Sequence, residues 1–245
     1  GVTDQLTNFN ATDNSLDCIE VNEEDVGWAT ENWTYENGNI DEGVEFSVVC
    51  VPEGYTYIHD NNFEQALIDL GYDDTLDDFV LTENIAGLDS LDVSNKEIND
   101  LTGIEDFTAL SYLACSTNQL TSLDVSANTA LTSLNCENNE LTSLDVSNNT
   151  ALTHLQCNNN QLTSLDVSNN TSLASLACNS NQLTVLDVST NAALTMLVCN
   201  ENQLTTLDVS NNTSLVDLQC LNNQLTTLDV SANTALTSLN CENNE

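Results

Sequence analysis

One block of 21 residues recurs through the second half of this chain and dominates what the chain can fold into. The copy from Leu152 to Ser172 reads LTHLQCNNNQLTSLDVSNNTS, and near copies follow one another from Leu110 without insertion or deletion. Six copies are complete, and a seventh reaches Glu245. A segment of this length cannot bury an apolar face by itself, so neighbouring copies must stack and share a core. The period therefore predicts a solenoid.

Within one copy, apolar residues keep fixed positions in both halves. The first half has the pattern LxxLxCxxNxL, and the second half has the pattern LxxLxVxxN. The block resembles the nested 21-residue leucine-rich repeats of secreted bacterial proteins, written LxxLxCxxNxLxxLDLxxN. This resemblance implies a mainly β, parallel solenoid. The repeated rhythm predicts two short parallel strands in every coil.

The solenoid is expected to span residues 88–245 and to begin with a 22-residue coil at 88–109. Residues 51–87 are interpreted as a linker followed by an amino-terminal cap. Asn61 and Glu64 have the spacing of a capping box, and Gly71 follows the amphipathic run that begins there. We therefore predict one short capping helix before the array.

Residues 1–50 fall outside the repeat register but resemble the carboxy-terminal cap of such an array. Leu6, Phe9, Ala11 and Asn14 occupy positions of a decayed copy. On this interpretation the chain begins with the cap of a preceding array. Further copies of the chain, covalently linked or assembled, are then expected to follow head to tail.

Cys18 and Cys50 are the two cysteines outside the 21-residue register. Placed in the resembling cap, they suit a disulfide that closes a loop of about 30 residues and stabilises it by about 3–4 kcal/mol. Such bridges persist in oxidising compartments, which predicts an extracellular or cell-surface location.

The other cysteines recur every 21 residues and are expected to form one column, which consists of Cys115, Cys136, Cys157, Cys178, Cys199, Cys220 and Cys241. No CxxC or Cys–His spacing accompanies them, and a closed zinc site needs four converging ligands. We therefore expect buried thiols that act as small apolar side chains rather than a metal array. A column of asparagines is expected to turn the backbone and bond to neighbouring coils, and it consists of Asn118, Asn139, Asn160, Asn181, Asn202, Asn223 and Asn244.

The chain carries one cation, Lys96, against 39 aspartates and glutamates, and its formal charge is −38. Nucleic acid is excluded as a partner because phosphate binding depends on lysine and arginine. Anionic membranes are excluded for the same reason, and no apolar run is long enough for membrane insertion. Two explanations of the acidity stay open, namely solubility at high ionic strength and the binding of Ca²⁺.

Carboxylates gather in two places that could hold Ca²⁺. One is a column in the second half of each copy, with neighbours about 4.8 Å apart, and it consists of Asp124, Asp145, Asp166, Asp187, Asp208 and Asp229. The other is the acidic turn after the predicted helix, with Asp73, Asp74, Asp77 and Asp78. Neighbouring charges in the column repel by under about 1 kcal/mol in water. Either bound cations or hydrogen bonds from the flanking hydroxyls would relieve this repulsion.

The outward residues in the first half of each copy vary while the apolar positions do not. The candidate ligand face consists of Tyr112, His154, Met196, Val198, Asp217 and Leu221. Variation on a constant core suggests a surface that recognises a protein or a glycan. Neutral drift on an exposed face would give the same pattern, and both explanations stay open.

Catalysis is not expected, because His59 and His154 are the only histidines and neither lies in a triad or metal motif. The leading hypothesis is a non-catalytic structural or adhesive module of a large secreted or cell-surface bacterial protein, forming an extended fibre or spacer. One alternative is a leucine-rich repeat module that recognises a protein or glycan. A lesser alternative is an ice- or mineral-binding solenoid. No cofactor other than Ca²⁺ is expected.

Overall fold

The computed structural model describes residues 9–14 and 16–245. The chain divides into two compact units, Gly1–Glu53 and Gly54–Glu245. Of the positions assigned above to a decayed repeat, Leu6 lies outside the described residues. The two units are described separately below.

The first unit is a small α/β cluster. Strand β1 (Cys18–Glu20) pairs in parallel with β2 (Glu45–Ser47), and helix α1 (Glu23–Asn32) connects them. Its core consists of Ala29, Trp33, Ile40, Val44 and Phe46. Cys18 and Cys50 form a disulfide with a Cα–Cα distance of 5.7 Å, and this bond closes the unit.

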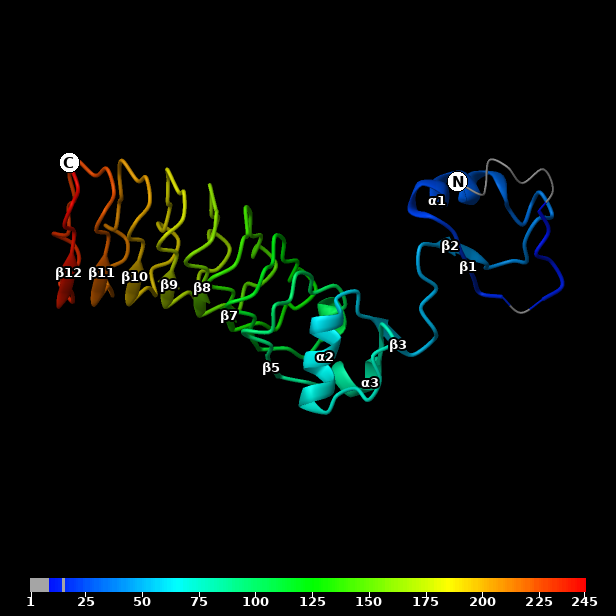
Figure 1. The fold of residues 1–245 in the computed structure, drawn as a ribbon. Coiled ribbons are helices and arrows are strands. Elements are labelled where there is room, and N and C mark those ends of the chain that lie inside the picture. The colour runs from blue at the N-terminus through cyan, green and yellow to red at the C-terminus, as the bar shows by residue number, and fades with distance from the viewer. Residues whose placement is uncertain (1–8, 15) are drawn as a thin grey trace. The chain divides into compact units, whose positions relative to one another are not determined.

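The second unit begins with a cap built on one two-stranded sheet and two helices. Strands β3 (Tyr55–Tyr57) and β4 (Phe79–Leu81) are antiparallel, and they flank α2 (Asn61–Leu70). The short helix α3 (Thr82–Ile85) follows β4. Phe63 of α2 stacks on Phe107 with a centroid separation of 6.2 Å, so the helix covers the apolar core at the start of the array (Figure 1).

Helix α2 is the predicted helix, but its amino-terminal cap is not the predicted capping box. Asp60 is the N-cap residue, and its Oδ1 accepts hydrogen bonds from the backbone N–H groups of Asn62 and Phe63. Glu64 is fully buried and accepts from the backbone N–H of Asp77 instead, at 2.8 Å. Gly71 ends the helix in the left-handed conformation with φ 82°, as expected for a glycine at this position.

The predicted capping helix is present as α2, and the described residues contain two further helices, α1 and α3, that were not predicted. Hydrophobic periodicity in the sequence does not reveal either helix, for a physical reason. Helix α1 buries only Asp25 and Ala29, and α3 has four residues. Neither therefore carries an apolar stripe of the kind that marks an amphipathic helix.

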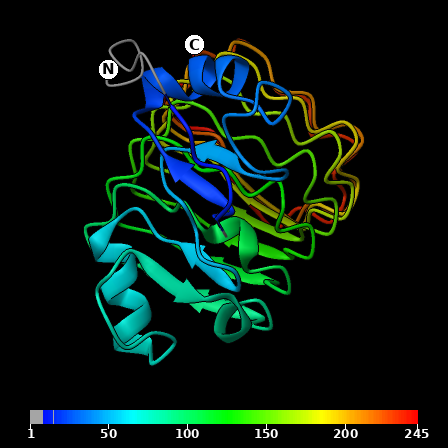
Figure 2. The same cartoon turned by 90° about the vertical axis from the view of Figure 1, so that its right-hand side faces the viewer.

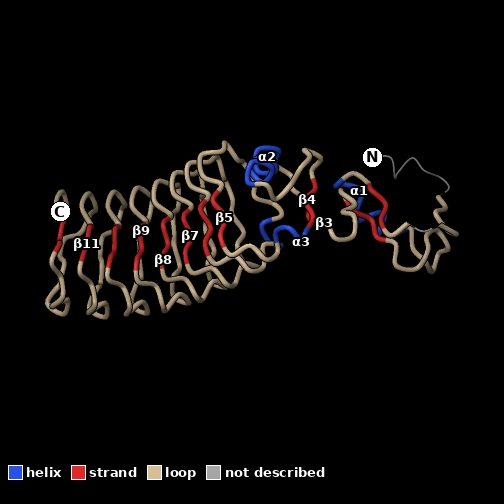
Figure 3. The backbone as a smooth tube through the Cα atoms, turned by 90° about the horizontal axis from the view of Figure 1, so that it is seen from below, coloured by secondary structure: helices blue, strands red, loops and turns tan. Residues whose placement is uncertain are grey.

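The array forms one parallel sheet of eight strands in sequential order, and this confirms the predicted parallel β solenoid. The strands are β5 (Ser90–Asp92), β6 (Tyr112–Ala114), β7 (Ser133–Asn135), β8 (His154–Gln156), β9 (Ser175–Ala177), β10 (Met196–Val198), β11 (Asp217–Gln219) and β12 (Ser238–Asn240). Figure 3 shows them as one row, with loops completing each coil. Successive coils follow the same path when viewed along the array (Figure 2).

The prediction of a second strand in each coil is wrong. In the described part of the chain, the second halves of the coils contain one isolated bridge, between Asp124 and Asp145, and no strand. The reason is the aspartate of the LDVS segment. Asp145 Oδ1 accepts from the backbone N–H of Ser147 at 2.9 Å, and this turn repeats in the other coils. That N–H is therefore not available for a ladder with the next coil.

Two kinds of buried side chain hold the coils together. The ladder cysteines from Cys115 to Cys220 are fully buried, whereas Cys241 is exposed. Each asparagine of the predicted ladder bonds to two coils. Asn160 donates to the carbonyls of Cys136 and Cys157 and accepts from the N–H of Leu141. Because all these groups are buried, the ladder satisfies backbone atoms that water cannot reach.

A left-handed residue precedes each ladder asparagine. Asn138 and Asn159 adopt φ 53° and Asn222 adopts φ 55°, which asparagine tolerates better than most residues. In other coils the same position is Thr117, Ser180 or Glu201, with φ of 53–55°. The turn is thus imposed by the stacked coils and does not require asparagine at that position.

Candidate functional site

The outward face of the sheet is built from columns of residues that are paired strand by strand. The first column runs through Ser90, Tyr112, Ser133, His154, Ser175, Met196, Asp217 and Ser238. The structure therefore brings Tyr112, His154, Met196 and Asp217 of the predicted face into one line. Serines separate the three large side chains, so Tyr112, His154 and Met196 lie two coils apart, about 10 Å from one to the next.

The large members of this column differ in exposure. Tyr112 is 40% exposed, His154 is exposed, and Met196 and Asp217 are half-buried. Tyrosine and methionine are enriched in protein interfaces. Both offer apolar area, and the flexible methionine side chain adapts to an irregular partner surface. The column is therefore a ridge of separated side chains with small residues between them.

The second and third columns are flatter. In the second, Val198 is half-buried and pairs with Ala177 and Gln219, while Ala177 is buried. In the third, Leu221 is half-buried, and its N–H donates to Asn200 Oδ1 at 3.0 Å. Val198 and Leu221 thus lie low beside the ridge, and they add apolar surface near Met196 and Asp217.

Hydrogen bonds fix the polar side chains of this face. Gln219 Nε2 donates to Asp217 Oδ1 on the same strand and to Ser238 Oγ on β12, so two neighbouring coils share one polar network. His154 Nδ1 lies 2.9 Å from Thr153 Oγ1. These contacts hold Asp217 and His154 in defined positions before any partner binds, which reduces the entropy lost on binding.

The aspartate column lies on the exposed second halves of the coils, away from the strands. Hydrogen bonds from Ser147 lower the pKa of Asp145, and the matching serines do the same along the column. Each carboxylate is thus used to form a turn in its own coil. Within the described residues, no three His, Cys, Asp or Glu side chains form a group that could hold a metal ion.

Two carboxyl groups lie in unusual surroundings where helix α2 meets the acidic turn 73–78. Glu64 Oε2 and Asp73 Oδ2 are buried and have no hydrogen-bond partner among the described atoms. Burial raises the pKa of both groups, and the neighbouring Asp73 and Asp78 charges raise that of Glu64 further. Asp74 and Asp77 are exposed, and they bond to nearby groups of the same turn.

The two histidines take part in different local contacts. His59 Nδ1 lies 2.8 Å from the hydroxyl of Tyr57 in the cap, whereas His154 lies on β8. A polar hollow of about 700 Å³ near His59 is also lined by Asp60 and Asp100. Both carboxylates are engaged there, since Asp60 caps α2 and Asp100 accepts from Thr102.

Sequence reasoning missed a column of threonines beside the sheet. Thr132, Thr153 and Thr195 donate their hydroxyls to the carbonyls of Ser111, Thr132 and Ala174 of the preceding coil. Val216 occupies the same position in the repeat and is 41% exposed. The 21-residue register alone could have revealed this column, and with it Val216 as an exposed apolar residue next to Asp217.

In the described part of the chain, no helix is sufficiently long and apolar to cross a bilayer.

Comparisons with known proteins place the array among leucine-rich repeats. The family model described as the leucine-rich repeat domain of the endo-β-N-acetylglucosaminidase EndoS matches residues 82–191. A model of the LVIVD repeat matches residues 197–218. Internalin J of Listeria monocytogenes is 48% identical to this chain over 52 residues, which make up 21% of this chain and 6% of that protein.

Solved structures agree with this assignment. The functional domain of InlJ from Listeria monocytogenes, which includes a cysteine ladder, is 37% identical with a TM-score of 0.64, and the match covers 81% of this chain and 49% of that one. A leucine-rich repeat protein of Leptospira interrogans is 25% identical with a TM-score of 0.63, covering 66% and 44%. Internalin C2 of Listeria monocytogenes, at 20% identity and a TM-score of 0.72 over 80% and 91%, shares the fold.

The present chain therefore spans about half the length of the InlJ domain and a small part of Internalin J. It has the same kind of coil, with a cysteine at the third apolar position of each repeat. The repeat pattern and the coil geometry make the array a leucine-rich repeat solenoid with a cysteine ladder, similar to the bacterial proteins above.

Proposed function

We propose that the chain is a non-catalytic binding module that recognises a protein through the outward face of strands β6–β11. The observation that carries this proposal is the ridge of Tyr112, His154 and Met196 with serines between them. The residues beneath it are leucines and cysteines that hardly change from coil to coil. A face that varies on a constant support can be fitted to a partner without disturbing the core.

A protein partner suits this face better than a glycan. The side chains that rise from it are aromatic, imidazole and thioether groups, with apolar surface from Val198, Val216 and Leu221 beside them. Such groups dominate the centres of protein interfaces. The single lysine of the chain, Lys96, lies in the first coil and is paired with Asp69, so the partner surface is expected to be neutral or basic.

The wider role proposed for this module is adhesion by a secreted or surface-attached bacterial protein. The Cys18–Cys50 disulfide supports an oxidising, extracellular location. A fibre or spacer role would use the same solenoid as a rigid support, with the ridge as its contact surface.

Two matched variants test the proposal. The face variant Tyr112→Ala, His154→Ala, Met196→Ala removes the ridge. The control variant Thr142→Ala, Thr163→Ala, Thr184→Ala changes three exposed residues in the second halves of the coils. Wild type and both variants are immobilised and exposed to a panel of purified extracellular proteins and to a glycan array.

We expect the wild type and the control variant to bind the same protein, and the face variant to bind it at least tenfold more weakly. Loss of about 1–2 kcal/mol at each of two anchor side chains would produce that change. A partner whose affinity falls in the control variant, or is unchanged in the face variant, would show that binding uses another surface.

A further inference from the structure

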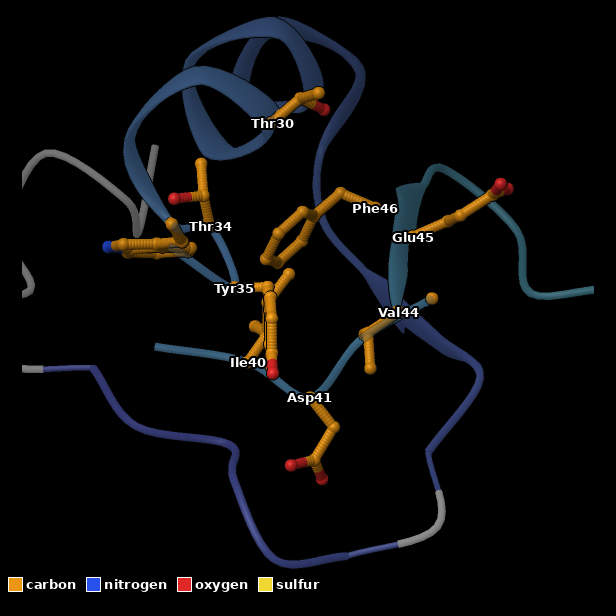
Figure 4. A pocket seen from close by; sticks show the side chains of 10 residues that line it. Thr30, Thr34, Tyr35, Ile40, Asp41, Val44, Glu45 and Phe46 are labelled. Atoms are coloured by element: carbon orange, nitrogen blue, oxygen red, sulfur yellow. The ribbon is translucent and has the colours of Figure 1, made fainter. Parts of the chain in front are cut away.

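The first unit contains a pocket of about 380 Å³ that none of the functions above uses. It lies beside the end of α1 and the segment leading into β2 (Figure 4). Its lining residues are Thr30, Trp33, Thr34, Tyr35, Ile40, Asp41, Gly43, Val44, Glu45 and Phe46. All ten belong to the unit Gly1–Glu53.

Aromatic rings form the main walls of this pocket, and most of them are held in place by the core. Trp33 stacks on Phe9 with centroids 4.1 Å apart, and Trp28 meets it edge-on at 5.2 Å. The ring of Phe46 lies 5.7 Å from Trp33. Tyr35 also lines the pocket and is 56% exposed (Figure 4). The pocket thus has two buried rings and one ring that a ligand can cover.

The edge of the pocket is acidic. Asp41 is held in position because its two carboxylate oxygens accept from the N–H groups of Asp13 and Asn14, at 3.1 and 3.0 Å. Glu45 also lines the pocket. Residues 1–53 contain no lysine or arginine, since Lys96 is the only cation of the chain. No lysine or arginine side chain of this unit therefore neutralises these charges, and a cationic occupant is electrostatically favoured.

The hydroxyl groups of the pocket are poorly placed to bind a sugar. Thr30 Oγ1 donates to the carbonyl of Val26 at 2.9 Å, and Thr34 Oγ1 accepts from the N–H of Asn37 at 3.2 Å. The carboxylate oxygens and the faces of the aromatic rings remain, together with the Tyr35 hydroxyl. A guanidinium group matches the carboxylates and the rings, because it is planar, offers only donors and stacks on aromatic faces.

We propose that this pocket binds an arginine side chain of a partner protein, stacked against Tyr35 with its N–H groups toward Asp41. The pocket is larger than one side chain, so residues that flank the arginine in the partner also fit. This site shares no residue with the ridge on the sheet, and it gives the chain a second contact that depends on charge.

The test uses the full chain and its own fluorescence. The chain has two tryptophans, Trp28 and Trp33, and both belong to the aromatic cluster of this unit. The probes are the peptide acetyl-Gly-Arg-Gly-amide and its citrulline analogue, which has nearly the same shape but no charge. We expect the arginine peptide to change tryptophan emission with a saturable curve at millimolar concentration, and the citrulline peptide to bind at least tenfold more weakly.

Variants locate the binding. Tyr35→Ala should weaken binding of the arginine peptide by about fivefold to tenfold, while Tyr35→Phe, which keeps the ring, should leave it within twofold. Asp41→Asn should weaken it by a similar factor. Glu140→Gln removes the same charge from an exposed position of the array and should have no effect. Near-ultraviolet circular dichroism checks that each variant keeps the wild-type fold.

Equal responses to the arginine and citrulline peptides would overturn the proposal. So would a response that Tyr35→Ala leaves unchanged, because the attraction would then come only from the net charge of the chain. The test does not involve the ridge, so its outcome is independent of the proposed function.

Discussion

A second column of buried asparagines lies in the second halves of the coils, and it consists of Asn128, Asn149, Asn170, Asn191, Asn212 and Asn233. It looks like the ladder column in the sequence but should contribute differently to stability. Asn160 and Asn170 lie in the same coil, and both are buried. Asn160 Nδ2 donates to the carbonyls of Cys136 and Cys157, and its Oδ1 accepts from the N–H of Leu141 at 2.9 Å. Asn170 Nδ2 also donates to two carbonyls, those of Val146 and Asn149, but its Oδ1 has no described partner.

Truncation to alanine therefore has different consequences at the two sites. Every carbonyl that Asn170 serves keeps another donor, because the N–H groups of Asn149 and Leu152 also bond to them. The carbonyls served by Asn160 likewise keep Asn139 and Asn181. The N–H of Leu141, by contrast, loses the one described acceptor that it has, and it is buried.

An orphaned buried donor costs about 1–3 kcal/mol, and each lost neutral hydrogen bond about 0.5–1.5 kcal/mol. Asn160→Ala should thus lower the free energy of unfolding by about 2–6 kcal/mol. Asn170→Ala loses two bonds but also removes an unpartnered acceptor, so its loss should be about 1–3 kcal/mol smaller than that of Asn160→Ala. Both sites are in a central coil, where fraying of the terminal coils does not dominate.

The assay is urea denaturation followed by far-ultraviolet circular dichroism, with comparison of the variants only if their m-values agree. Hydrogen exchange at the amides of the neighbouring coil gives a second, local reading. If the two variants were destabilised equally within about 0.5 kcal/mol, the role assigned to the Leu141 N–H would be wrong.

Three further predictions concern the titratable groups. Iodoacetamide at pH 8 should label Cys241 and none of the buried ladder cysteines in the native protein, because burial raises the pKa of Cys157 to about 12 and of Cys220 to about 11. Mass spectrometry after unfolding should find all seven ladder cysteines labelled. Labelling of Cys157 before unfolding would contradict the packing. Burial raises the pKa of Glu64, so its contribution to stability is largest below the unfolded pKa and is lost as pH rises through the raised folded pKa. The variant Glu64→Gln should therefore unfold at a higher temperature than wild type at pH 7 and at nearly the same temperature at pH 4. A lower unfolding temperature of the variant at pH 7 would refute the predicted direction of this effect. Calcium binding stays a prediction. If divalent ions relieve repulsion along the aspartate column, millimolar CaCl₂ should raise the melting temperature more than NaCl of equal ionic strength, and the double variant Asp145→Asn, Asp166→Asn should reduce that difference. Equal shifts with both salts would indicate screening alone.

The fold of the array was predictable because its signal is redundant. Each apolar position recurs in every copy, so a residue such as Cys157 can be assigned to the core by its register alone. The second strand was predicted wrongly because the LxxLxV pattern records burial and not backbone pairing. Leu165 and Val167 are buried as expected. The side chain of Asp166 nevertheless takes the N–H of Ser168 and makes a turn there.

The first unit was less predictable because its contacts are not periodic. The stack of Phe9 on Trp33 joins residues 24 positions apart, with no repeat to indicate the pairing. Likewise, Asn61 and Glu64 have the spacing of a capping box, but burial of Glu64 against the turn at Asp77 decides otherwise. Local patterns identify which residues compete for a role, and tertiary packing selects among them.

The residues that join the coils differ from the residues that form the outward face. Backbone groups between coils are satisfied by buried asparagines and by threonine hydroxyls at the edge of the sheet, not by the ridge residues. Tyr112 and Met196 make no described hydrogen bond through their side chains, so their replacement by alanine should change the free energy of unfolding by little more than about 0.5 kcal/mol, as for other surface positions. A loss of binding in the face variant can then be assigned to the face itself. This independence of surface from core is also the physical reason why the ridge can vary between coils that are otherwise nearly identical.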